Sequence, residues 1–252
     1  MITDRLKYEA HAMSHPGKVR TNNEDALFAS EVLGVFAVAD GMGGHERGEW
    51  ASAAIVEGLR EVPREGDFDS LLDKVSAAIH TANAVIYAEA QDKHVSMGST
   101  AVALVLKDER FAVMWVGDSR CYVLRDGVLH QLSRDHTRVQ EMIDRGLLTP
   151  EQSVGHPMGH VLSRAVGVGA ALELDGVADE PSPGDVFLLC SDGLYGVVSD
   201  TEIAGVLATS SLSEAAHNLV DLCLARGAPD NVTVVLVRVS EATVLSFAGQ
   251  AE

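Results

Sequence analysis

The chain has 252 residues, of which 19 are Lys or Arg and 37 are Asp or Glu, so its formal net charge is −18. With 46% hydrophobic and 22% charged residues, it has ample material for a large core, which excludes a disordered acidic chain. Such a negative protein repels nucleic-acid phosphates and anionic membranes, so the composition excludes both as partners.

Six short apolar runs, rich in β-branched residues, predict strands. They are Gly34–Ala39, Ala101–Leu106, Phe111–Val116, Cys121–Leu124, Val186–Leu189 and Val232–Val239. Asp126 and Gly127 lie between apolar flanks and predict a hairpin turn. Strands joined by so short a turn must be antiparallel.

Apolar residues spaced by three and four predict two long amphipathic helices. Their stripes are Trp50, Ala54, Ile55, Leu59 and Val62, then Leu72, Val75, Ile79, Ala82 and Ile86. Ser199 and Glu202 form a capping box that opens a third helix. Two further helices are expected, a short one starting at Thr149-Pro150 and one from Ser213 to Arg226 that ends at Gly227.

Groups of antiparallel strands separated by pairs of helices do not alternate as βαβ units. The pattern therefore predicts an α+β fold, with helices packed on antiparallel sheets, and leaves open whether there is one sheet or two. No repeat or linker interrupts the chain, so we expect a single domain over residues 1–252.

Three cysteines, Cys121, Cys190 and Cys223, form an odd set without short spacing. They exclude a disulfide framework and a CxxC site, and we interpret them as buried thiols of a protein from a reducing compartment. The N-terminus lacks the apolar segment of a signal peptide, and no apolar run approaches the roughly 20 residues that span a bilayer. We expect a cytoplasmic protein.

Four aspartates lie at the ends of predicted strands. Asp40, Asp118 and Asp192 each follow an apolar run, and Asp230 precedes one. A single Asp in such a position is most often a turn former or a helix cap. If all four converge, however, their mutual repulsion requires cations between them, and ligands that are all oxygen select Mg²⁺ or Mn²⁺.

Arg20 lies in a polar loop just before Glu24 and Asp25, and its guanidinium suits either a phosphate or those neighbouring acids. The glycine-rich turn at residues 40–45 lacks the spacing of a nucleotide-binding loop. No GxSxG elbow occurs, and no cysteine has an Arg at the spacing of a cysteine-dependent phosphatase loop.

Eight short motifs follow one another along the chain: RTNNED (20–25), VADGMGGH (38–45), GST (98–100), VGDSRCY (116–122), LSRDHT (132–137), LSRAVG (162–167), LLCSDGL (188–194) and DNVTVV (230–235). In these motifs and their order the chain resembles the protein phosphatase 2C family of metal-dependent Ser/Thr protein phosphatases, in its minimal bacterial form. The resemblance implies a four-layer α-β-β-α sandwich with two antiparallel sheets, a catalytic core over about residues 8–240 and a flap over about 138–164.

The resemblance also implies a centre of two Mn²⁺ or Mg²⁺ ions, with a third site. Asp40 would bridge the two ions, and the remaining ligands would be the carbonyl of Gly41, the carboxylates of Asp192 and Asp230, and Glu24 acting through water. Arg20 would hold the substrate phosphate, Asp118 with Asp192 would form the third site, and Asp25 would support the loop.

The implied reaction is hydrolysis of phosphoserine and phosphothreonine by metal-activated water, without a phosphoenzyme. Met42 stands where many eukaryotic members have His, so another group must supply the leaving-group proton, and His45 is a nearby candidate. His156 and His160 are expected to be flap residues rather than metal ligands, since oxygen donors already account for the metals.

The expected partners are phosphorylated proteins and a cognate bacterial Ser/Thr kinase, and the chain is expected to be a monomer. Two other functions predict different patterns of acidic residues. A phosphoprotein-binding pseudophosphatase predicts loss of metal carboxylates, and none of the core set is missing here. An acidic interaction scaffold predicts scattered acids, whereas these lie at strand ends.

Overall fold

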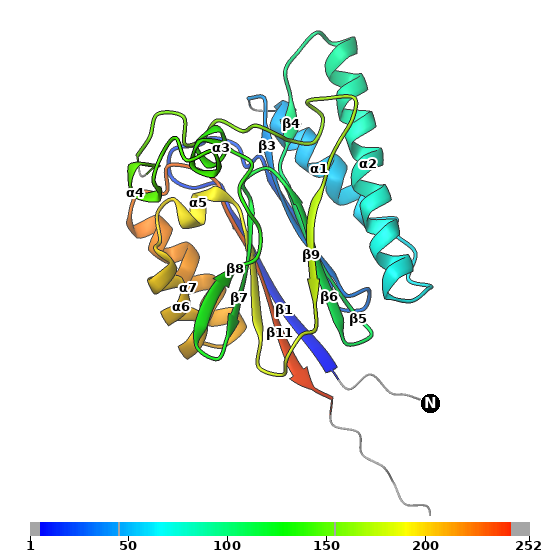
Figure 1. The fold of residues 1–252 in the computed structure, drawn as a ribbon, viewed down its shortest axis with the longest axis vertical. Helices are drawn as coiled ribbons and strands as arrows, with labels where there is room; N and C mark the ends of the chain where they lie inside the picture. The colour runs from blue at the N-terminus through cyan, green and yellow to red at the C-terminus, as the bar shows by residue number, and fades with distance from the viewer. Residues whose placement is uncertain (1–5, 45, 154, 243–252) are drawn as a thin grey trace, which may run out of the picture.

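The computed structural model describes residues 6–44, 46–153 and 155–242. Two antiparallel sheets lie face to face (Figure 1). The first has the strand order β1-β11-β10-β7-β8, with β1 Leu6–His15, β11 Val232–Glu241, β10 Val186–Cys190, β7 Arg120–Arg125 and β8 Val128–Gln131. The second has the order β2-β3-β5-β6-β9, with β2 Asp25–Ser30, β3 Val35–Met42, β5 Ala101–Lys107, β6 Arg110–Val116 and β9 Asp175–Asp179, while β4 Gly98–Ser99 pairs with the end of β3.

Helices cover the outer face of each sheet (Figure 1). The β3 sheet carries α1 Glu46–Arg60 and α2 Phe68–Asp92, and the β11 sheet carries α6 Asp200–Thr209 and α7 Leu212–Ala225. Three short helices lie at the upper end: α3 Arg138–Asp144, α4 Pro150–Ser153 and α5 Asp192–Tyr195. The two sheets and two helical layers confirm the predicted four-layer α-β-β-α sandwich.

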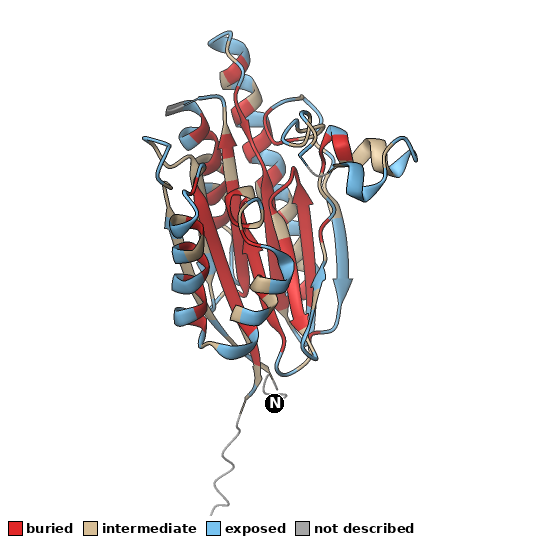
Figure 2. Ribbon diagram, turned by 90° about the vertical axis from the view of Figure 1, so that its left-hand side faces the viewer, coloured by how far each residue is buried: buried red, intermediate tan, exposed pale blue. Residues whose placement is uncertain are grey.

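The central strands are buried on both faces, which Figure 2 shows as red strands between the helical layers. On β3, Phe36 and Val38 face the other sheet, while Val35 and Ala37 pack against α1 and α2. Side chains alternate between the faces of a strand, so a strand between two apolar layers must be apolar at every position. This is why the central strands read as continuous apolar runs.

All six predicted strands are confirmed, as are the hairpin after β7 and the helices α1, α2, α4, α6 and α7. Strands β1, β2, β4, β8 and β9 and helices α3 and α5 were not among the predicted elements. Every residue of β1 and β2 is at least partly solvent-accessible, and β9 is mostly exposed. None of these strands therefore has a continuous apolar run.

Two details of the predicted helices are wrong. Trp50, placed in the apolar stripe of α1, is 39% exposed, because the buried face of α1 is formed by Ala51, Ile55 and Leu59. The last helix begins at Leu212 after a Ser211–Glu214 capping box, not at Ser213.

The three cysteines are buried and free, as expected. Within the described part of the chain, no helix is both long and apolar enough to cross a membrane.

Candidate metal centre and active site

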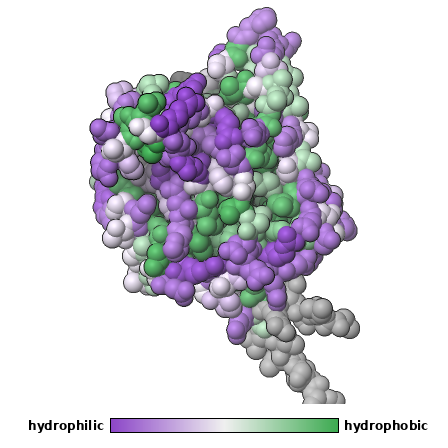
Figure 3. All heavy atoms as spheres, viewed as in Figure 1, coloured by the Kyte–Doolittle hydropathy of each residue, from purple (hydrophilic) through white to green (hydrophobic). Residues whose placement is uncertain are grey.

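All seven residues that the sequence analysis assigned to the site line one pocket of about 510 Å³ at one end of the sandwich. They are Arg20, Glu24, Asp40, Gly41, Asp118, Asp192 and Asp230. Hydrophilic residues dominate the flap end of the face shown in Figure 3. Acids from five separate segments converge because each lies at or near the end of a strand, and these strand ends meet at the same end of the sandwich.

Asp40 lies near the end of β3, and its main chain is held by Thr100. The Asp40 N–H donates to Thr100 Oγ1 at 2.9 Å, and the Thr100 N–H donates to the Asp40 carbonyl at 2.8 Å. Thr100 Oγ1 also lies 2.7 Å from Ser119 Oγ, next to Asp118. A single threonine therefore connects the segments that carry Asp40 and Asp118.

Asp192 and Asp230 are brought together by a close approach of their main chains. A Cβ on Gly193 would lie 1.9 Å from the carbonyl oxygen of Asn231, so only glycine fits there. The Asn231 side chain accepts from the Glu24 N–H at 2.8 Å and donates to the carbonyl of Asn22 at 2.9 Å. These bonds attach the loop of Arg20 and Glu24 to the start of β11.

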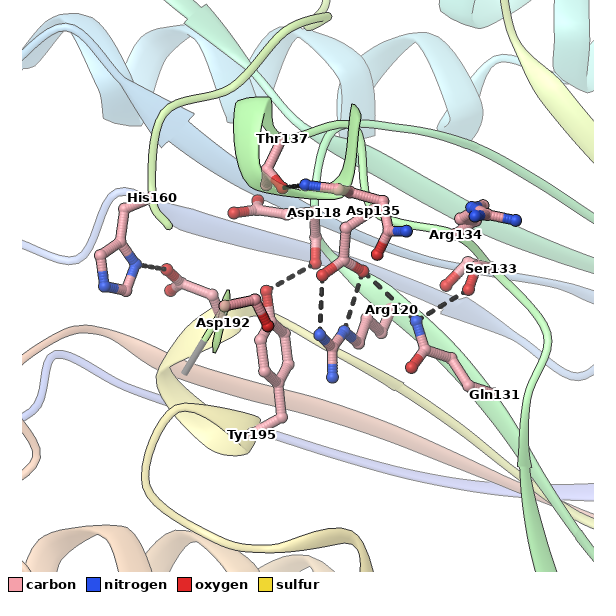
Figure 4. A network of polar contacts seen from close by, with 12 residues as sticks. Asp118, Arg120, Gln131, Ser133, Arg134, Asp135, Thr137, His160, Asp192 and Tyr195 are labelled. Carbon is pink, nitrogen blue, oxygen red and sulfur yellow. Dashed lines mark hydrogen bonds and ion pairs between the residues drawn. The ribbon is translucent and has the colours of Figure 1, made fainter. Parts of the chain in front are cut away.

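Two basic side chains, one from the N-terminal loop and one from the flap, lie against the acids. Arg20 Nη2 donates to Asp230 Oδ2 at 2.7 Å, and the pair is largely exposed at the mouth of the pocket. His160, from the flap, has its Nδ1 atom 3.6 Å from Asp192 Oδ2, and Figure 4 shows this ring approaching the carboxylate. A guanidinium and an imidazole thus each contact one of the pocket carboxylates.

Burial and mutual repulsion raise the pKa values of the clustered carboxyls. Burial is the largest cause for Asp40, whose pKa is raised well above its usual value, followed by the charge of Asp25 and then that of Asp192. Burial and then Asp192 raise the pKa of Asp118 to about 7, and burial and then Asp230 raise that of Asp192. Such a cluster stores charge repulsion that a bound cation would relieve.

Asp25 lies beside this cluster, opposite Asp40 in the β2–β3 pair. Its Oδ2 atom accepts from Ser191 Oγ at 2.7 Å, while its buried Oδ1 atom has no hydrogen-bond partner among the residues that the structure describes. The pKa of Asp25 is raised to about 7, chiefly by burial. An orphaned buried carboxylate oxygen next to the acids fits a water or cation at this position.

The donor set fits a hard divalent cation, since it consists of carboxylate and carbonyl oxygens with no cysteine among the pocket residues. Across residues 6–44, 46–153 and 155–242, no group of three or more His, Cys, Asp or Glu side chains is already arranged to hold a metal ion. The fit therefore lies in donor chemistry and charge, and closing the ligands around an ion requires side-chain adjustment.

The family model for protein phosphatase 2C matches residues 17–222. The chain belongs to the protein phosphatase 2C family. It is 40% identical over 240 residues to the serine/threonine protein phosphatase PstP of Mycobacterium tuberculosis, an alignment that covers 94% of this chain and 46% of PstP. The chain thus spans about half the length of this curated relative.

Two solved structures show the same protein phosphatase 2C fold. PppA, a key regulatory component of T6SS in Pseudomonas aeruginosa, is 41% identical with a TM-score of 0.87, over 92% of this chain and 98% of PppA. The catalytic domain of the phosphatase PstP in complex with two manganese ions is 38% identical with a TM-score of 0.84, over 93% and 99% of the two chains. The second of these family members is a metal-bound protein.

Several pocket residues of this family member were not assigned from the sequence. Thr100 belongs to the GST motif, but no role was predicted for it from the sequence. Its two hydrogen bonds to the main chain of Asp40 explain why a small hydroxyl residue occupies this position. His160 and Arg164 line the pocket, whereas His156 is not among the lining residues. Met42 lines the pocket as well, and His45 lies outside the described residues.

Proposed function

We propose that this protein is a Mn²⁺- or Mg²⁺-dependent protein serine/threonine phosphatase that hydrolyses phosphoserine and phosphothreonine directly with water. The observation that carries this proposal is the convergence of Asp40, Asp192 and Asp230 with Arg20 in one pocket of a protein phosphatase 2C chain. The manganese-bound relative PstP supports the choice of metal.

In this proposal Asp40, Asp192, Asp230 and the Gly41 carbonyl hold two ions, with Glu24 acting through water, and Asp118 with Asp192 holds a third. When bound, such ions supply a nucleophilic hydroxide at neutral pH and neutralise charge on the phosphoryl oxygens. The chain's own contribution is orientation: Thr100 fixes the main chain of Asp40, and Gly193 allows the Asp192 and Asp230 segments to approach.

Arg20 is the proposed phosphate-binding residue. Its guanidinium has five N–H donors, and one of its nitrogens is engaged by Asp230. The ion pair with Asp230 orients the planar fork at the pocket mouth, where the remaining donors can bind two phosphate oxygens. Arg20 would thereby offset charge that develops on the phosphoryl group during the transfer.

Water rather than a side chain is the proposed nucleophile. Cys121, Cys190 and Cys223 are buried away from the pocket, and burial raises the pKa of each thiol, which opposes the reactive thiolate form. The hydroxyls of Thr100 and Ser119 are paired with each other. These observations favour direct hydrolysis without a phosphoenzyme.

The proposed substrates are phosphorylated proteins, and the proposed partner is a cognate bacterial Ser/Thr kinase whose phosphorylation this enzyme reverses. We further propose that the enzyme acts in the cytoplasm as a monomer. A phosphoprotein-binding pseudophosphatase would use the same scaffold, but the retained carboxylates of the pocket do not favour it.

The test compares hydrolysis of a phosphothreonine peptide and of p-nitrophenyl phosphate by wild type and by Asp40→Asn, with Mn²⁺ and with EDTA. We expect Mn²⁺-dependent turnover by wild type and a loss of about 100-fold or more in Asp40→Asn, since Asp40 would be a direct ligand of the ions. Asp73→Asn, an exposed change on α2, is the matched control. Undiminished activity of Asp40→Asn, or wild-type activity that persists in EDTA, would overturn the proposal.

A further inference from the structure

Tyr195 connects the two segments that carry Asp118 and Asp192. It is the last residue of α5, three positions after Asp192, and its hydroxyl donates to the main-chain carbonyl of Asp118 at 2.9 Å. Figure 4 shows the Tyr195 side chain extending from α5 to the Asp118 segment. The Tyr195 side chain thus joins the two segments whose acids would form the third metal site.

Arg120 holds the ring of Tyr195 in place. The guanidinium carbon lies 3.6 Å from the centre of the Tyr195 ring, which is the geometry of a cation–π contact. Arg120 itself donates to both oxygens of Asp135, at 2.9 Å and 2.7 Å, and these two side chains are mostly buried (Figure 4). A bidentate pair of this kind keeps the planar guanidinium in one orientation.

The Tyr195 hydroxyl is the donor in its hydrogen bond to the Asp118 carbonyl. Burial, and next the charge of Asp118, raise its pKa well above the usual range, so the phenol keeps its proton. A carbonyl oxygen can only accept, so the Tyr195 phenol is always the donor in this hydrogen bond. Arg120 follows Asp118 by two residues, so the bond to the carbonyl and the contact beneath the ring brace the same short segment from two directions.

We propose that Tyr195, braced by Arg120 and Asp135, is a positioning residue that sets the separation of Asp118 and Asp192 and thereby the affinity of the third metal site. The proposal rests on the proposed function, because it assumes that these two acids bind a metal. Tyr195 acts on the site through the main chain of Asp118 rather than as a ligand. Such supporting hydrogen bonds commonly change metal affinity by about 10–100-fold.

The chain offers a closely matched control. Tyr122 is fully buried and its hydroxyl accepts from Arg120 Nη1 at 2.9 Å. Tyr122→Phe and Tyr195→Phe therefore each delete one hydroxyl from the same cluster, and both leave the Arg120–Asp135 pair and the aromatic ring. Only Tyr195→Phe removes a hydrogen bond to Asp118 itself, since Tyr122→Phe removes one to the Arg120 side chain.

The experiment measures Mn²⁺ binding to the metal-free protein by calorimetry and by the electron paramagnetic resonance signal of free Mn²⁺, for wild type, Tyr195→Phe, Tyr122→Phe and Asp118→Asn. We expect Asp118→Asn to lose the weakest site. Tyr195→Phe should weaken that site by about 10-fold or more and leave the tighter sites within about twofold. Tyr122→Phe should leave all sites within about twofold of wild type. The Mn²⁺ concentration for half-maximal activity should rise in Tyr195→Phe by the same factor as the dissociation constant of the weakest site.

Wild-type affinity at every site in Tyr195→Phe would overturn the positioning role. Equal weakening of all sites together with a lower Tm would also overturn it, since that pattern indicates general destabilisation. If wild type binds two ions and Asp118→Asn binds the same two, there is no third site to position. That result would overturn this inference but leave the proposed two-metal hydrolysis intact.

Discussion

Asp25 and Asp40 are directly opposed residues of the antiparallel pair β2–β3, and Asp40 lines the pocket. Burial and then the charge of Asp25 raise the pKa of Asp40, so each acid makes the other harder to ionise. A pair of this kind is destabilising when it stands without cations and favourable when it faces them. The Asp25–Asp40 pair therefore makes the free energy of unfolding depend on whether a cation is bound at this end of the sandwich.

Replacing Asp25 by Asn should separate the cost of the charge repulsion in the metal-free protein from its benefit to cation binding. The amide can keep the acceptor for Ser191 Oγ while the charge opposite Asp40 is removed. We expect Asp25→Asn to stabilise the EDTA-treated protein by about 1–3 kcal/mol and to weaken Mn²⁺ binding, as measured by urea unfolding and by calorimetry. Asp73→Asn on the exposed face of α2 should change neither quantity. A destabilised metal-free Asp25→Asn protein would contradict this account of the charge repulsion.

His136 makes the stability depend on pH. It is buried, its Nδ1 atom accepts from the Gly117 N–H at 3.1 Å, and burial is the main cause that lowers its pKa, while nearby Arg164 lowers it and Asp175 raises it. The unfolded state therefore takes up a proton more readily, so stability is fully present above about pH 6.5 and falls as the pH drops below it.

The comparison that isolates this effect is His136→Asn, whose side-chain oxygen can still accept from Gly117. Between pH 7 and pH 5, wild type should lose about 1 kcal/mol more of its free energy of unfolding than His136→Asn, as measured by urea denaturation. His130→Asn, on the exposed strand β8, should behave as wild type. A wild type and a His136→Asn protein with parallel pH profiles would exclude His136 as the source.

Gly193, which directly follows the pocket residue Asp192, should not tolerate a side chain. In Gly193→Ala the new Cβ would meet the Asn231 carbonyl at 1.9 Å, so the Asp192 and Asp230 segments must separate. We expect a loss of at least about 3 kcal/mol by thermal unfolding, together with weaker Mn²⁺ binding. Gly205→Ala on α6, where no atom lies within 4 Å of the new Cβ, should instead stabilise by about 0.5–1 kcal/mol. Equal effects of the two changes would show that the close approach is unimportant.

The Arg125–Asp185 pair stabilises the end of the sandwich far from the pocket. Asp185 is 1% exposed and accepts from Arg125 Nε and Nη2 at 2.9 Å and 2.6 Å. Arg125→Met leaves this buried carboxylate without its cation and should cost about 2–4 kcal/mol in urea unfolding. Arg60→Met, which breaks the exposed pair with Glu57 on α1, should cost no more than about 1 kcal/mol. A similar loss for both variants would contradict the role of burial.

Strands β3, β5, β6, β10 and β11 could be predicted because each lies between two apolar layers and therefore has an apolar side chain at nearly every position. Strands β1 and β2 could not, because their residues are largely half-buried and mixed with polar side chains, and their pairing with β11 and β3 is long-range. Trp50 shows the opposite error, since its spacing matched an apolar stripe although the helix turns it towards solvent.

The sequence by itself determined the alternation of buried strands with helices and the donor chemistry of four aspartates at strand ends, because these follow from residue type and local order. Only the tertiary structure decided that the aspartates share one pocket with Arg20, that Thr100 holds Asp40, and that Tyr195 reaches the Asp118 carbonyl. Arg20 and its partner Asp230 are 210 positions apart, Asp40 and Thr100 are 60 apart, and Tyr195 and Asp118 are 77 apart. Contacts over such separations depend on which strands pair and on how the two sheets pack, and no local pattern contains that information.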